Sequence, residues 1–370
     1  MSEGMMKNIV ILATGGTIAG AGEPGKSIGY KSGAIDALTL IDAIPELKNV
    51  ANIRVEQVCN INSDDITSEI WIALARRIQE LLHHEDVDGI VVMHGTDTME
   101  ETAFFLSLTL GANHSNTVEN TTKPVILTGS MRPATAMEPD GPANLLFAVK
   151  SAVNLCERPV RESSKETEFS AALESVILEA KRRGSSEVYV AFANKLMNAR
   201  WVQKIHANNL DAFDEVDSDG FCANVAPAFD VSSLHSLPKV AVLYFNADAD
   251  PEYVRFAAKL SAGLVIAGAG AGEFSRAWAE ALADVVSKIP VVVSTRINRG
   301  SVVPGQLLVP GTIAAYGLPP AKAAVLLRLA LTVSNDSVVI QNFFETCTHC
   351  HPERSVTESK DPVKFRGIKI

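Results

Sequence analysis

The sequence is short of cysteine, lacks long apolar runs and carries no excess of positive charge. Its five cysteines are few, odd in number and scattered, which argues against a disulfide framework and favours a reducing compartment. No apolar run approaches the roughly 20 residues that a membrane-spanning helix requires. The first residues, MSEGMMKN, lack the basic and apolar regions of a signal peptide. We therefore expect a cytoplasmic protein with no membrane partner.

The charge balance points away from nucleic acids. The chain has 33 lysines and arginines against 43 acidic residues, which gives a net charge of −10. A protein that binds nucleic-acid phosphates needs a basic surface, so this class of partner is not expected. Hydrophobic residues make up 47% of the 370 residues, as in an ordinary globular protein. A chain of this length predicts two domains, and its acidity favours a small-molecule substrate.

Apolar, β-branched runs alternate with helical patterns along the chain. The runs NIVILAT, DGIVVMH, KPVILTGS and EVYVAFAN lack the polar alternation of a half-exposed strand. They are typical of parallel strands that are buried on both faces. The segment TSEIWIALARRIQELL repeats apolar residues at the helical period. The predicted fold class is therefore α/β, with a larger, doubly wound, mainly parallel N-terminal sheet.

A segment rich in Ser, Pro and small residues, APAFDVSSLHSLP at residues 226–238, predicts a linker between two domains. We expect an N-terminal catalytic domain at residues 1–225 and a smaller α/β domain at residues 239–344, where strand and helix patterns resume. A charged insertion at about 156–187 and a polar tail at 345–370 fit neither predicted core.

Two of the predicted strands end in glycine and threonine. The first is followed by TGGT at residues 14–17, and the second by HGTDT at residues 94–98. The first motif lacks both the Lys of a P-loop and the pattern G-x-G-x-x-G. It is either a tight turn that requires glycine or a ligand-binding turn. Because ligands bind beyond the carboxyl ends of parallel strands, both motifs are expected at one edge of the sheet.

The second motif also leaves two interpretations open. Thr96 and Asp97 either cap the helix that begins near Met99 or contribute to a reactive site, and both roles are compatible. A threonine hydroxyl is a weak nucleophile that needs a nearby base or a lowered pKa.

Three segments, ILATGGTIAG, HGTDTMEET and TGSMRPATAMEPDGPANL, together resemble the bacterial-type L-asparaginase family, the asparaginase/glutaminase amidohydrolases. The resemblance covers residues 8–344 apart from the insertion. It implies hydrolysis of L-asparagine to L-aspartate and ammonia through a threonine acyl-enzyme, without a cofactor or metal. It also implies a flavodoxin-like C-terminal domain and a homotetramer of close dimers, with each site completed by a neighbour's C-terminal domain.

The resemblance assigns catalytic roles to five residues. It makes Thr17 the nucleophile and Tyr30, in the loop that follows, its assistant, while Thr14 is expected to be structural. It places Thr96, Asp97 and Lys204 in a second catalytic set. The segment NARWVQKIHANNLDAF matches a family pattern only in part, and Lys204 stands at the position of the lysine in that pattern.

Substrate binding is assigned in the same way. Ser63 in NINSDD would contact the α-carboxylate, Asp97 the α-ammonium, and a backbone amide at Gly95 the oxyanion. From a neighbouring subunit, Asp248 is expected, and a shift of two residues in the match would select Asn246 or Asp250 instead.

The chain departs from the family pattern at two places. Asp64 stands where many members have Gln. The acidic residue that a neighbour's C-terminal domain usually contributes is missing, and the uncharged Gln306 is the nearest candidate. We hypothesise that Asp64 partly substitutes for that missing carboxylate.

Other functions remain open at this point. The tail motif CTHCH matches a haem-attachment pattern, but its compressed spacing does not favour a metal site. A glutaminase-asparaginase is the nearest alternative enzyme, because one methylene is worth only about 1–3 kcal/mol of discrimination. A module that senses asparagine without hydrolysing it is the alternative from a different class.

Overall fold

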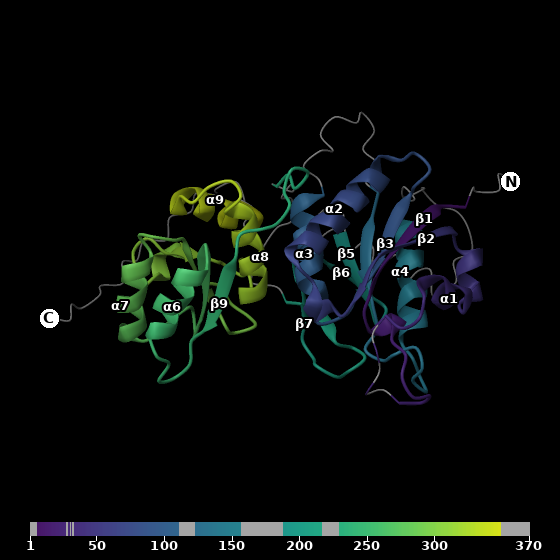
Figure 1. Ribbon diagram of the computed structural model, residues 1–370, viewed down its shortest axis with the longest axis horizontal. Helices are drawn as coiled ribbons and strands as arrows, with labels where there is room; N and C mark the ends of the chain where they lie inside the picture. The colour runs from purple at the N-terminus through teal and green to yellow at the C-terminus, as the bar shows by residue number, and fades with distance from the viewer. Residues whose placement is uncertain are drawn as a thin grey trace, which may run out of the picture.

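A six-stranded sheet forms the N-terminal part of the molecule and a four-stranded sheet the C-terminal part (Figure 1). The computed structural model describes residues 6–26, 29, 31, 33–110, 123–156, 188–216 and 229–348. Tyr30, almost all of the predicted insertion and the tail beyond residue 348 lie outside the described residues. Both sheets are mainly parallel, which confirms the predicted α/β class.

The N-terminal sheet has the strand order β2-β1-β3-β4-β5-β6. Its strands are β1 (Asn8–Gly15), β2 (Asn52–Ile61), β3 (Gly89–Met93), β4 (Val125–Thr128), β5 (Val188–Phe192) and β6 (Lys195–Asn198). Only β6 is antiparallel to its neighbour. Strands β3, β4 and β5 are buried along their whole length, as their continuous apolar sequences predict. A separate two-stranded sheet pairs β7 (Val202–Lys204) with β8 (Phe213–Glu215).

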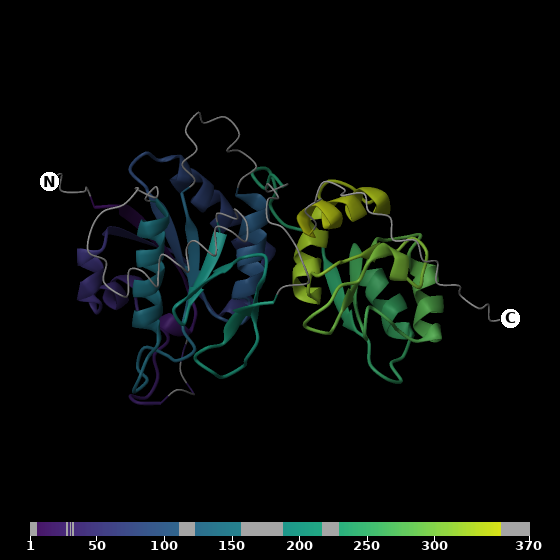
Figure 2. The same ribbon diagram turned by 180° about the vertical axis from the view of Figure 1, so that it is seen from behind.

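Helices cover both faces of the N-terminal sheet, so it is doubly wound (Figures 1 and 2). Helices α2 (Ser68–His83) and α3 (Met99–Thr109) pack on one face, and α1 (Ala37–Asp42) and α4 (Gly141–Cys156) pack on the other. The short 3-10 turns η1 (Thr17–Ala19), η2 (Pro45–Asn49) and η3 (Ser63–Asp65) occupy the connections. Helix α2 begins after Thr67, whose Oγ1 accepts a hydrogen bond from the Ile70 amide.

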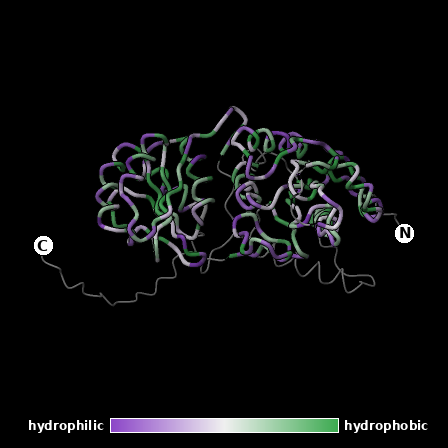
Figure 3. Tube along the Cα trace, turned by 60° about the horizontal axis from the view of Figure 1, so that its bottom comes forward, coloured by the Kyte–Doolittle hydropathy of each residue, from purple (hydrophilic) through white to green (hydrophobic). Residues whose placement is uncertain are grey.

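The C-terminal sheet is parallel, with the order β12-β11-β10-β9. Its elements are β9 (Val240–Tyr244), α6 (Glu252–Leu260), β10 (Gly263–Gly268), α7 (Arg276–Val285), β11 (Val291–Thr295), η4 (Pro304–Gln306), β12 (Ile313–Ala314), α8 (Pro320–Ala330) and α9 (Ser337–Thr348). Helix α9 continues past residue 344, where the sequence patterns predict the end of the domain. Figure 3 shows hydrophobic strands at the centre of this part and hydrophilic segments around it.

Helix α8 connects the cores of the two parts. It lies between the two sheets (Figure 1), and its buried side chains belong to the same apolar cluster as those of α2 and α3. Helices α6 and α7 instead form a separate cluster on the outer face of the C-terminal sheet. Within the described ranges, no helix is both long and apolar enough to cross a membrane.

Candidate active site

The candidate site lies where three neighbouring parallel strands end. Strands β2, β1 and β3 run side by side in the same direction. Their carboxyl ends lead directly into Ser63, Thr17 and Gly95 respectively. This edge is where open α/β sheets bind ligands.

Glycines allow the three loops to touch through their backbones. Gly16 has a φ of 78°, and a Cβ added to it would lie only 2.5 Å from the backbone nitrogen of Gly95. A Cβ on Gly95 would in turn lie 2.7 Å from Ser63 Oγ. The TGGT turn therefore requires glycine at position 16. Thr17, the next residue, directly follows the contact between Gly16 and Gly95 of the second motif. The tight-turn interpretation of TGGT is confirmed, and ligand binding by this turn stays a prediction.

The two threonines of the first motif differ in environment. Thr14 is 2% exposed, and its Oγ1 donates a hydrogen bond to the Met93 carbonyl at 2.9 Å. This bond joins β1 to β3 and confirms the prediction that Thr14 is structural. Thr17 is only partly buried at the start of η1.

Ser63 joins its loop to the HGTDT motif. It is 4% exposed, and its Oγ accepts a hydrogen bond from the Asp97 amide at 3.2 Å. Its carbonyl accepts a second bond from Thr98 Oγ1 at 2.7 Å. The N-cap of α3 is Thr98, and the side chain of this cap makes no capping hydrogen bond. The predicted cap formed by Thr96 and Asp97 is therefore wrong, because both side chains bind a cation instead.

That cation is the ammonium of Lys204. Its Nζ donates to Thr96 Oγ1 at 2.9 Å and to Asp97 Oδ1 at 2.6 Å. The Lys204 side chain is 15% exposed, whereas that of Asp97 is 67% exposed. Thr96 is buried. The structure thus brings the second predicted set together, with a buried hydroxyl on one side of the ammonium and an accessible carboxylate on the other.

Glu100, which was not among the predicted residues, holds the backbone of Lys204. Its Oε2 accepts a hydrogen bond from the Lys204 amide at 2.5 Å. Glu100 lies in the first turn of α3, where an acidic residue is common for helical reasons alone. The sequence carried no other signal for its contact with Lys204.

His94 holds the Gly95 peptide through a hydrogen bond to the Gly95 carbonyl. That carbonyl can only accept, so His94 Nδ1 carries the ring proton and donates to it at 2.7 Å. The Thr102 hydroxyl, which accepts from the Trp71 indole N–H at 2.8 Å, donates to the unprotonated Nε2 at 3.0 Å. Complete burial lowers the pKa of His94 to about 4, so the ring is neutral and positions the turn.

The remaining predicted residues lie elsewhere or are not described. Asp64 is exposed in η3, next to Ser63. Asp248 follows β9 in the C-terminal part, exposed and with a φ of 61°, so it is not a member of the Lys204 cluster of its own chain. Among the described residues, no group of three His, Cys, Asp or Glu side chains is placed to hold a metal ion.

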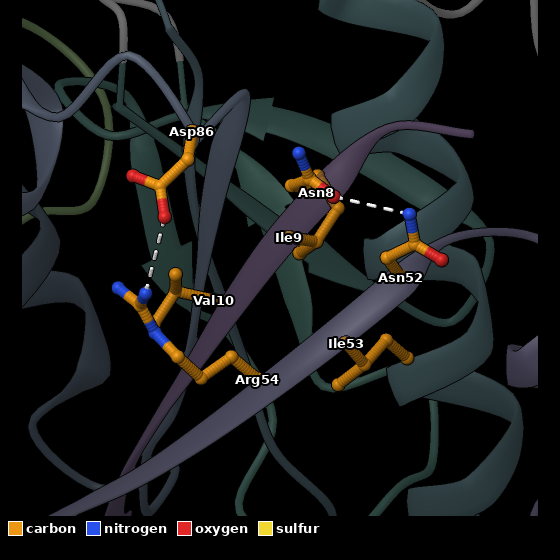
Figure 4. Close-up of a pocket in the computed structure, with 7 residues that line it drawn as sticks. All are labelled: Asn8, Ile9, Val10, Asn52, Ile53, Arg54 and Asp86. Carbon is orange, nitrogen blue, oxygen red and sulfur yellow. Dashed lines mark hydrogen bonds and ion pairs between the residues drawn. The ribbon is translucent and has the colours of Figure 1, made fainter. Parts of the chain in front are cut away.

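A pocket of about 340 Å³ lies at the opposite end of the N-terminal sheet. It is lined by the first residues of β1 and β2 and by Asp86, which pairs with Arg54 at 3.6 Å (Figure 4). The lining residues include none of the predicted site residues. The pocket is therefore distinct from the candidate site, which lies at the edge of the sheet where the loops of Thr17, Ser63 and Gly95 meet.

Comparisons with known proteins cover nearly the whole chain. The family model described as "Asparaginase, N-terminal" matches residues 8–164 and 163–228, and "Glutaminase/Asparaginase C-terminal domain" matches residues 239–344. The chain is 38% identical over 359 residues to L-asparaginase 2 of Bacillus subtilis, covering 92% of this chain and 86% of that one. It is 36% identical over 363 residues to the probable periplasmic L-asparaginase of Haemophilus influenzae, covering 92% and 93%.

A solved structure is similar as well. The crystal structure of the probable cytoplasmic L-asparaginase from Campylobacter jejuni has a TM-score of 0.75 and 37% identity to this chain. The match covers 92% of this chain and 99% of that one. Both domains and their order are therefore shared.

Proposed function

This chain belongs to the asparaginase family, and we propose that it hydrolyses L-asparagine to L-aspartate and ammonia through a covalent threonine intermediate. The observation that carries the proposal is the Lys204 ammonium bound to both Thr96 and Asp97, beside the Gly16–Gly95 backbone contact. That arrangement supplies an activated hydroxyl, an accessible carboxylate and a neighbouring nucleophile in one place. It requires no cofactor or metal.

The chemistry would proceed in two steps. The Thr17 oxygen attacks the side-chain amide carbon, the C–N bond breaks, and ammonia leaves with the proton that the hydroxyl gave up. Water then attacks the resulting β-aspartyl ester, the C–O bond to Thr17 breaks, and the hydroxyl is restored. Both steps need a proton carrier. Because the Lys204 ammonium stabilises negative charge on Thr96 Oγ1, this hydroxyl would be suited to pass protons.

Other residues would bind the substrate. An amide at the Gly95–Thr96 turn would donate to the oxyanion, an interaction worth about 3–4 kcal/mol in other hydrolases. The exposed carboxylate of Asp97 would bind the α-ammonium, and Ser63 the α-carboxylate. We further propose that Asp64 adds a negative charge near that ammonium and that Tyr30 assists Thr17.

An apolar face on the C-terminal part supports a homotetramer. Large apolar side chains on the edge strand β9 and on α6 are 37–63% exposed: Val242, Tyr244, Tyr253, Phe256 and Leu260. Several large apolar side chains exposed on two adjacent elements are typical of an interface. We propose that it packs on a second copy and helps bring Asp248 to the neighbour's site. Light scattering should give the mass of four chains, and a mass of one chain at micromolar concentration would contradict the proposal.

Ammonia release from asparagine and glutamine tests the proposed activity. We expect kcat/KM for asparagine to exceed that for glutamine at least about tenfold, since one methylene discriminates by roughly 1–3 kcal/mol. Equal values would favour a glutaminase-asparaginase instead. Calorimetric binding of asparagine with no ammonia formed would favour a sensing module.

The cellular location is tested separately. Activity recovered in the cytosolic fraction of the source cells would support the cytoplasmic location that the cysteine pattern favours, and recovery in a periplasmic fraction would contradict it.

A further inference from the structure

A lysine of the C-terminal domain is buried against the backbone that carries Lys204. Lys322 lies in α8 and is 0% exposed. Its Nζ donates to the carbonyl oxygens of Ala199, Arg200 and Val202 at 2.9, 2.8 and 2.6 Å. An ammonium has three protons, so one short segment satisfies all of them.

The burial of this charge needs an explanation. A charge without solvent is stable only when it is fully hydrogen-bonded, and an apolar side chain would fill the same helical position without that requirement. Burial lowers the pKa of Lys322 to about 8, partly offset by the charge of Glu100, so the ammonium form dominates at neutral pH. Its Nζ also lies 5.6 Å from the centre of the Phe104 ring on α3.

The segment that Lys322 holds also makes backbone contacts: the Ala199 amide donates to the Val188 carbonyl, and the Trp201 carbonyl accepts from the Val216 amide. Residues 199–202 lead from β6 into β7, which ends at Lys204. Strand β7 lies outside the large sheet, and its one partner strand among the described residues is β8, over three residue pairs. A two-stranded ribbon of this length is marginally stable alone. Contacts beyond this ribbon therefore help to fix the position of Lys204.

Side chains from both parts of the chain help to fix it. Glu100, at the start of α3, accepts from the Lys204 amide, and Lys322 binds the Val202 carbonyl two residues upstream. Helix α8 packs against α3, next to which it lies in Figure 1. The Lys204 ammonium must remain 2.9 Å from Thr96 Oγ1, and a displacement of about 1 Å in an active site can cost roughly 10²-fold in rate.

We propose that Lys322 is a positioning residue: from the C-terminal domain of the same chain, it holds the backbone of β7 so that the Lys204 ammonium stays on Thr96 and Asp97. This inference rests on the proposed catalytic role of Lys204. It gives the C-terminal domain a function in its own chain's site, in addition to any contact with a neighbouring subunit.

A double-mutant cycle on the full chain tests the inference. Lys322→Met removes the ammonium and keeps an unbranched side chain. We expect kcat for asparagine to fall about 10- to 100-fold while KM changes less than about threefold, because the substrate-binding loops are not held by Lys322. In the Lys204→Met background, Lys322→Met should lower kcat no further, since it acts through Lys204. Lys288→Met, at an exposed lysine after α7, serves as the matched control.

The outcomes separate the inference from the proposed function. If Lys204→Met loses activity but Lys322→Met keeps its kcat, or lowers kcat equally in both backgrounds, then Lys322 has only a structural role. If Lys204→Met keeps its activity, the proposed function of the site fails first. Should Lys322→Met not fold, as circular dichroism would show, Lys322→Arg decides. Its planar guanidinium should shift the segment and lower kcat at constant KM, and an unchanged kcat would overturn the inference.

Discussion

Replacement of Thr17 by alanine is expected to lower kcat for asparagine by roughly 10³-fold or more, which corresponds to about 4 kcal/mol of lost transition-state stabilisation. The hydroxyl is the attacking group in the proposed first step, and the substitution leaves no nucleophile in its place. Residual turnover would come from the remaining oxyanion and binding contacts. Asparagine binding, measured by calorimetry, should persist, because Ser63 and Asp97 are untouched.

Two controls make the Thr17 result specific. Thr17→Ser keeps a hydroxyl at the same position and should retain far more activity than Thr17→Ala. Thr39→Ala removes an exposed hydroxyl on α1 and should not change kcat. Added hydroxylamine should divert part of the wild-type product to the β-aspartyl hydroxamate, since it competes with water for the ester. A kcat for Thr17→Ala within tenfold of wild type would show that another group attacks.

The fold was largely predictable because its signals are local. Continuous apolar runs predict buried strands whatever their neighbours are, and β3, β4 and β5 form as expected. The assembly of Thr96, Asp97 and Lys204 was predicted from family resemblance, since 108 residues separate Thr96 from Lys204 and no local pattern connects them. Interpreting Thr96 and Asp97 as a helix cap was wrong, because the capping preference ignores a distant cation.

The contacts that hold Lys204 were not predictable for a different physical reason. Glu100 binds a backbone amide, and Lys322 binds three backbone carbonyls. Such partners are present at every residue, so the sequence around Lys204 does not mark them. Lys322 is one of two cations, with Arg328, in the otherwise apolar helix PAKAAVLLRLA, so its charge alone does not mark it. Asp248 is different again, because its proposed role requires a second copy of the chain.

Lys204→Met is the second substitution with a large expected effect, a loss of about 10³-fold in kcat. Methionine retains the length of the side chain but donates no proton, so the Thr96 hydroxyl loses the ammonium that stabilises negative charge on its oxygen. Asp97 loses an ion pair as well, but its carboxylate is largely exposed and solvent compensates for much of that loss. Stability should therefore change far less than activity, and thermal unfolding followed by circular dichroism measures this difference.

Lys195→Met is the matched control for Lys204→Met. Lys195 lies on the neighbouring strand β6, and its ammonium pairs with the exposed carboxylate of Asp211 at 2.8 Å. Exposed pairs contribute about 0–1 kcal/mol, so this variant should keep wild-type kcat and nearly wild-type stability. If both variants lost activity equally, the effect would come from general loss of positive charge. A loss confined to Lys204→Met would instead locate the effect at the ammonium bound to Thr96, because the two lysines differ in what their Nζ atoms contact.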